Sequence, residues 1–115
     1  MLLLSLASLW HWTQHPDCTP GNLSVGYWQV SRVYALLGQP DAARQYGQLC
    51  LKSSRGEGTL PFHLCYAYEA LARAEMVSGN PARMKEYLDL ARQASQTMED
   101  LETKKQLLAD LATIK

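Results

Sequence analysis

The sequence contains one helix–turn–helix pattern twice, and this duplication limits the possible folds more than any other feature. The first copy turns at Gly38 and Pro40, and the second turns at Gly79 and Pro81, 41 residues later. Glycine here can take the left-handed conformation that ends a helix, and proline fits the first turn of the next helix. Each turn therefore predicts two antiparallel helices joined by a tight connection.

The residues on either side of the turns are repeated as well. Comparison of residues 24–54 with 65–95 gives these identical pairs: Tyr27 and Tyr68, Arg32 and Arg73, Gly38 and Gly79, Pro40 and Pro81, Tyr46 and Tyr87, Leu49 and Leu90, Ser54 and Ser95. The small residues Ser31 and Ala72 are also equivalent, and we expect them to let two helices approach closely. The pattern indicates two copies of one supersecondary unit.

Apolar residues recur at three- and four-residue spacing along the chain, as in amphipathic helices, and no stretch alternates like a strand. We therefore predict a single all-α domain of about six helices. Its parts are an N-terminal apolar helix and loop (1–20), repeat one (24–54), repeat two (65–95) and a capping helix (100–115). The first helix is expected to run from about Leu2 to His15. The second is expected to be capped by Asn22 or Ser24 and to end at Leu37.

The duplicated unit resembles the tetratricopeptide repeat (TPR) family. The residues that carry the resemblance are Tyr34, Gly38 and Ala43 in the first copy, and Tyr68, Leu71, Ala72, Gly79, Leu88 and Ala91 in the second. The resemblance implies a right-handed stack of antiparallel helical hairpins, with the first and last helices as caps. The period of 41 is longer than the usual 34, and Gly47 stands where the family usually has a large side chain.

The family resemblance also implies that the first helix of each hairpin lines a concave surface that binds peptides. The inward residues would be Val25, Trp28, Arg32, Ala35, Tyr66, Glu69, Arg73 and Met76. We predict that Trp28, Arg32, Tyr66, Glu69 and Arg73 bind a partner. Two guanidinium groups in register suit a carboxylate or another anion. In the alternative interpretation, Arg73 pairs with Glu69 on its own helix and Arg32 is solvated.

The first ten residues, MLLLSLASLW, are strongly apolar. This run has no basic start or cleavage site of a signal peptide, and it is too short to span a membrane. Its large residues lie on several faces of a helix: Leu2, Leu3, Leu4, Leu6, Leu9, Trp10 and Trp12. We expect the helix to be buried, either by the hairpins or by a second subunit. Leu2, Leu3, Leu6 and Trp10 are the candidate homodimer contacts.

A second candidate site follows this run. His11 and His15 lie four residues apart on the predicted helix, and Asp17 and Cys18 come directly after it. These are residue types that bind zinc, so they form an alternative metal or small-ligand site. The HExxH pattern of a zinc protease is absent, because no glutamate stands between the two histidines.

Composition excludes some functions. Eleven basic and eleven acidic residues give a formal net charge of zero, which does not favour nucleic-acid binding. Three cysteines, without CxxC spacing, favour a reducing, cytoplasmic environment. No catalytic motif occurs, so no enzyme activity or cofactor is expected. The leading hypothesis is a non-catalytic module that binds a protein or peptide, and the alternatives are a homo-oligomer and the metal site.

Overall fold

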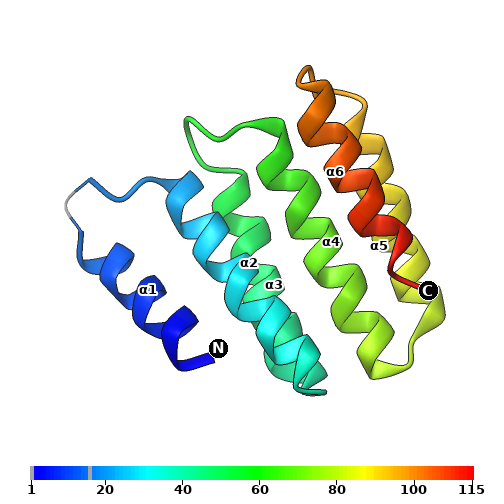
Figure 1. The fold of residues 1–115 in the computed structure, drawn as a ribbon, viewed down its shortest axis with the longest axis horizontal. Helices are drawn as coiled ribbons and strands as arrows, with labels where there is room; N and C mark the ends of the chain where they lie inside the picture. The colour runs from blue at the N-terminus through cyan, green and yellow to red at the C-terminus, as the bar shows by residue number, and fades with distance from the viewer. Residues whose placement is uncertain (1, 16) are drawn as a thin grey trace.

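The computed structural model describes residues 2–15 and 17–115, apart from the side chains of Leu2 and Trp12. Over these residues the chain forms six α-helices and no strand, which confirms the all-α class (Figure 1). The helices are α1 (Leu2–Gln14), α2 (Pro20–Leu36), α3 (Pro40–Ser54), α4 (Pro61–Ser78), α5 (Pro81–Ser95) and α6 (Leu101–Ala112).

Proline begins each of the four central helices, α2 to α5, where its missing N–H leaves no bond unmade. The Thr19 hydroxyl accepts a hydrogen bond from the backbone N–H of Asn22 at 3.2 Å, so Thr19 is the N-cap of α2. The prediction that Asn22 or Ser24 caps this helix is therefore wrong. The helix starts at Pro20 because Thr19 and Pro20 together supply the cap and the first-turn residue.

The two Gly-x-Pro turns are equivalent in three dimensions, as predicted. Gly38 and Gly79 have φ values of 72° and 78°, the left-handed region that only glycine enters without strain. Each glycine N–H donates to the carbonyl three residues earlier, at 3.1 and 3.2 Å. The following residue donates in both turns to the carbonyl five residues earlier, at 3.0 Å. These bonds satisfy the last carbonyls of α2 and α4 and reverse the chain.

The duplication extends beyond the turns to the helices. The bounds of α5 are those of α3 displaced by 41 residues, and α2 and α4 begin at Pro20 and Pro61 with the same displacement. A tyrosine pair joins the two helices of each hairpin. The ring centroids of Tyr27 and Tyr46 are 6.3 Å apart, and those of Tyr68 and Tyr87 are 6.4 Å apart. The two hairpins thus share bounds, turns and an aromatic contact.

The helices form two layers. Figure 1 shows α2, α4 and α6 side by side in front, with α3 behind α2 and α5 behind α6. Helix α4 contacts α2, α3, α5 and α6, and it contributes more buried residues than any other helix. Helix α1 contacts only α2 among the described residues. Helix α4 is therefore the centre of the domain, and α1 lies at its edge.

Small residues set the close approach of the helices. Ser31 is buried and donates a 2.7 Å hydrogen bond to the Ala43 carbonyl, so α2 and α3 lie close together. A Cβ added at Gly47 would lie only 2.8 Å from Leu71 Cδ2. The glycine that departs from the family pattern therefore gives Leu71 of α4 the space it occupies against α3.

The last helix, α6, contributes to the main hydrophobic core. Leu107, Leu111 and Ile114 pack with Leu88 and Met98 in one buried cluster. Its N-cap is Asp100, whose carboxylate accepts hydrogen bonds from the backbone N–H groups of the first turn. The helix therefore closes the second hairpin with apolar residues inside.

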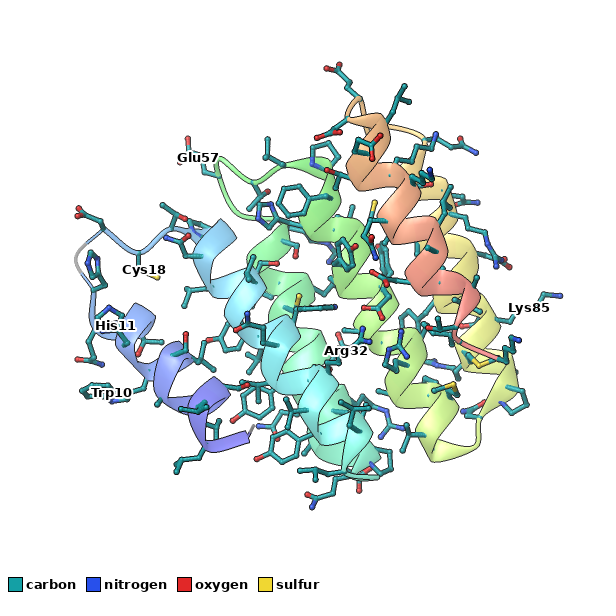
Figure 2. All side chains as sticks on the ribbon, in the orientation of Figure 1. Trp10, His11, Cys18, Arg32, Glu57 and Lys85 are labelled. Carbon is teal, nitrogen blue, oxygen red and sulfur yellow. The ribbon has the colours of Figure 1, made fainter. Side chains whose placement is uncertain are left out.

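The first helix, α1, is buried on one side only. Leu9 is the residue that packs most deeply, at 7% exposure, and it contacts α2 at Gly26. Leu3, Leu4 and Trp10 are 79%, 76% and 66% exposed. Figure 2 shows Trp10 on the outer side of α1, away from α2. Of the two expected ways to bury α1, cover by the hairpins is wrong, because α2 is its one neighbouring helix among the described residues; cover by a second subunit stays a prediction.

Candidate functional site

The five residues predicted to bind a partner lie together on the face formed by α2 and α4. Trp28 and Arg32 come from α2, while Tyr66, Glu69 and Arg73 come from α4. The Trp28 and Tyr66 rings meet edge to face, with centroids 5.5 Å apart. The Arg32 guanidinium lies over the Trp28 ring, with Cζ 5.6 Å from its centroid. Figure 2 places Arg32 near the middle of the molecule, between α2 and α4.

Glu69 is the centre of this group, and it is only 1% exposed. The indole Nε1 of Trp28 donates to Glu69 Oε2 at 2.6 Å, and Arg73 Nε donates to Oε1 at 2.9 Å. Arg32 Nη1 lies 3.7 Å from the same Oε1. Burial of a carboxylate is costly unless cations and hydrogen-bond donors surround it. Both helices supply such donors here, so Glu69 ties α2 to α4.

The two arginines differ in how far their guanidinium groups are exposed and already bound by the protein. Arg73 is 9% exposed, and its Nη2 also contacts Glu69 Oε1 at 2.8 Å and Thr113 Oγ1 at 3.0 Å. The alternative prediction that Arg73 pairs with Glu69 is confirmed. Its second part, a solvated Arg32, holds only in part, because Arg32 also stacks on Trp28 and approaches Glu69. The Arg32 side chain nevertheless remains 37% exposed.

Helix α6 adds residues to this face that were not predicted. The Tyr66 hydroxyl donates to Asp110 Oδ2 at 3.0 Å, and Arg73 Nη2 donates to the Asp110 carbonyl at 3.5 Å. Burial, followed by the bond to Asp110, raises the pKa of Tyr66 well above its usual value, so the phenol stays protonated. Trp28, Glu69 and Asp110 are spaced by 41 residues each. This spacing was the available signal that α6 continues the face.

An open cavity of about 370 Å³ lies where α2, α4 and α6 meet. Four of its lining residues are large and apolar or aromatic: Val25, Trp28, Phe62 and Tyr66. The remaining lining residues are Ser24, His63, Gln106 and Asp110. Aromatic walls with a few polar groups are typical of a binding site for an apolar side chain.

The other predicted inward residues have different surroundings. Val25 is 42% exposed and lines this cavity, as expected. Ala35 is buried against Ala43 and Ala74 between the hairpins, so its predicted place on the binding surface is wrong. Met76 is partly buried and packs against the core of the second hairpin.

A buried polar cluster that includes Ser24 of the cavity wall joins α2 to α3 within the first hairpin. Ser24 Oγ lies 2.7 Å from Ser54 Oγ and 3.5 Å from Cys50 Sγ. Burial raises the pKa of Cys50 to about 11, and that of Cys65 also to about 11, so neither thiol forms a thiolate at neutral pH. Both cysteines pack in the core, as expected. This chemistry gives no activated nucleophile at either position.

His63, to which no role was assigned, is placed at the start of α4. Its Nδ1 accepts a hydrogen bond from the Leu60 N–H at 3.0 Å. Burial lowers the pKa of His63. This histidine therefore acts as a cap for the helix end.

The four residues of the alternative metal site are not arranged as a set of metal ligands. The His11 and His15 rings lie 5.6 Å apart, and His15 Nδ1 accepts a hydrogen bond from the Asp17 N–H at 3.1 Å. The described residues, Cys18 included, contain no group of three or more His, Cys, Asp or Glu side chains placed to hold a metal ion. The geometry thus gives the metal hypothesis no support.

Comparisons with known proteins give no match: no family model, no curated protein and no solved structure is similar to this chain. Across the described residues, every helix is too short or too polar to cross a membrane.

Proposed function

We propose that this chain is a non-catalytic protein-interaction module that binds a peptide segment of a partner on the α2–α4–α6 face. The observation that carries the proposal is the cavity of about 370 Å³, with Trp28 and Tyr66 in its wall. Trp, Tyr and Arg are the residues most enriched at binding hot spots, and all three types meet here. The bond from the Trp28 indole to the buried Glu69 fixes this ring in the cavity wall.

The same proposal includes a TPR-like architecture. The Arg32–Glu69 contact is repeated by the Arg73–Asp110 contact, in which both residues lie 41 positions later in the chain. This register supports the view that α6 corresponds to the first helix of a third unit, rather than only to a cap. The face would then be the concave surface of a short repeat array, formed by three first helices.

The test uses a variant that fills the cavity without touching the Glu69 network. Val25→Trp places a large ring at a position that is already 42% exposed. Leu90→Trp is the matched control, because Leu90 is 38% exposed and belongs to α5 in the other layer. Peptides would be selected on the wild-type protein from a phage-displayed random library, and their affinities measured by fluorescence polarisation.

We expect Val25→Trp to weaken the selected peptides about tenfold or more, a loss of about 1.4 kcal/mol, whereas Leu90→Trp should leave binding unchanged. Circular dichroism would show that both variants keep their helix content. Equal binding of the peptides to Val25→Trp would overturn the assignment of this face. Failure to select any peptide would overturn the interaction module itself.

We also propose, as a second candidate, that the chain forms a homo-oligomer through α1. The exposed Leu3, Leu4 and Trp10 favour it, since exposed apolar groups that cluster on one helix are typical of contact surfaces. Leu6, half-buried, is the remaining described residue of the predicted contact set, which also included Leu2. The helix contains no Asp, Glu, Lys or Arg, so two copies would meet without charge repulsion.

Light scattering coupled to gel filtration tests the oligomer. We expect a dimer at micromolar concentration and a monomer for Leu3→Ser combined with Trp10→Ser. Leu101→Ser is the matched control, because Leu101 is 77% exposed at the start of α6. A wild-type monomer at every concentration would end this second proposal.

A further inference from the structure

Trp28 separates two cavities of different chemistry on the proposed binding face. On the α4 and α6 side lies the apolar cavity with Val25, Phe62 and Tyr66. On the α1 side, a cavity of about 490 Å³ is lined by Ser5, Ser8, Gln29 and Arg32 along with Leu4, Val33 and Leu36. Trp28 lines both cavities. A ligand that crosses α2 at Trp28 would therefore meet an apolar subsite and a mixed one that includes a guanidinium.

The carboxylates near this face are already engaged. Both oxygens of Glu69 accept hydrogen bonds, from Trp28 and from Arg73. Asp110 Oδ2 accepts from Tyr66 at 3.0 Å, and its Oδ1 accepts from Gln106 at 3.2 Å. Glu69, at 1% exposure, is therefore closed to a positively charged ligand, while Asp110 is half-buried and engaged by neutral donors.

Of the two arginines on this face, one keeps a guanidinium that a ligand can reach. Arg73 is buried and engages Glu69, Thr113 and the Asp110 carbonyl. Arg32 makes one ion-pair contact, at 3.7 Å, and its side chain is 37% exposed. Among the described residues, no carboxylate lines the Arg32 cavity. This cavity therefore offers an exposed guanidinium, which is complementary to an anion, whereas the Asp110 carboxylate lies in the wall of the apolar cavity.

We infer that the face recognises an internal peptide segment with one acidic and one large apolar side chain, bound on opposite sides of Trp28. The acidic group pairs with Arg32, and the apolar group enters the cavity beside Tyr66. The Tyr66 centroid and Arg32 Cζ lie 5.5 and 5.6 Å from the centre of the Trp28 ring. The two ligand residues are therefore about two or three positions apart, at roughly 3.3 Å per residue of extended chain.

This inference rests on the proposed function and specifies its ligand. The probes are short, N-acetylated, C-amidated alanine peptides that carry one glutamate and one phenylalanine separated by one alanine, in both orders. Matched peptides have glutamine for the glutamate, or alanine for the phenylalanine. Binding would be followed by the indole N–H signals of the three tryptophans in ¹⁵N-resolved NMR spectra, with Trp28 assigned by its loss in Trp28→Phe.

We expect one of the two glutamate–phenylalanine orders to shift the Trp28 signal at lower concentration than the other. The glutamine and alanine peptides should bind about tenfold more weakly, because each lacks one of the two contacts. Arg32→Gln should remove the preference for glutamate over glutamine, and Arg32→Lys should retain part of it. A thermal melt of each variant would report its folding separately.

The outcomes separate the two proposals. If the glutamate and glutamine peptides bind the wild-type protein equally, the acidic specificity is wrong. If the library peptides are still weakened by Val25→Trp, the interaction module stands without that specificity. If these probes leave Trp28 unchanged while library peptides bind at the cavity, the inferred pairing of acidic and apolar groups is wrong. If neither the probes nor the library peptides bind, the proposed function fails as well.

Discussion

The two outer helices were expected to have the same role, and the structure gives them opposite surfaces. Helix α6 inserts Leu107 and Leu111 into the main core, and Ile114, just after the helix, packs with them. Helix α1 buries Leu9 at its contact with α2 and exposes Leu3 and other large apolar residues. Both helices are short and leucine-rich, so leucine content alone does not distinguish a helix that closes a core from one that presents an apolar surface.

The distribution of charged residues explains the difference. Helix α6 carries Glu102, Lys104, Lys105 and Asp110 among its leucines, which leaves one apolar side for the core. Helix α1 has no Asp, Glu, Lys or Arg, so no side of it is fitted to water. A single neighbour, α2, can cover only part of such a helix. The uncovered part is the surface we propose for oligomerisation.

The largest effect that this comparison predicts is on the core side of α6. Leu107 is fully buried, so Leu107→Ala should lower the free energy of unfolding of the whole domain by about 2–5 kcal/mol, through lost burial and the cavity left behind. Chemical denaturation measures it. Leu101→Ala, on the same helix at 77% exposure, should stay within about 0.5 kcal/mol of wild type. Equal losses for the two variants would show that α6 is not seated in the core as described.

At the opposite end, Leu9→Ala should have a smaller and more local effect. Leu9 contacts Gly26 of α2, and α1 has no other helix as a neighbour among the described residues. We expect α1 to open locally, so that hydrogen exchange of its amides speeds up while α4 and α5 keep their protection. Leu3→Ala is the control and should change neither. A loss of protection throughout the domain would show that α1 belongs to the central cooperative unit.

Much of the fold was predictable because its signals are local. Gly38 and Gly79, with the prolines that follow them, specify where two helices end and the next begin, and the turns have the expected geometry. The duplication was readable for the same reason. The start of α2 was misjudged because two adjacent residues, Thr19 and Pro20, act together as the cap and first turn, although composition suggested a loop.

For the candidate site, the sequence predicted which residues share a face, but not how they are buried and bonded. The repeat put Arg32 and Arg73 in register, and the resemblance to TPR units implied that Trp28 shares their face; the three side chains do lie together. That Glu69 would be buried among these side chains depends on how α2 and α4 pack, which periodicity does not specify. The contribution of Asp110 depends on where α6 lies, and the resemblance to known repeats suggested only a cap. Tertiary contacts between helices therefore set the chemistry of the face.

The smallest effect that we predict is on stability, and it distinguishes the N-cap of α6, Asp100, from the N-cap of α2, Thr19. Hydrogen bonds from the backbone and hydroxyl of Thr103, and from the Glu102 backbone, lower the pKa of Asp100 below its usual value. The ionised carboxylate therefore stabilises α6 above the usual Asp pKa, near 3.9, and this contribution is lost as the pH falls through the lowered value. Thermal melts should show Asp100→Asn slightly less stable than wild type at pH 7. The difference should vanish below the lowered pKa. The Thr19 cap of α2 has no such group, so Thr19→Ala should cost about 1 kcal/mol at either pH. A difference for Asp100→Asn that persists in acid would mean that the cap works through hydrogen bonding and not through charge.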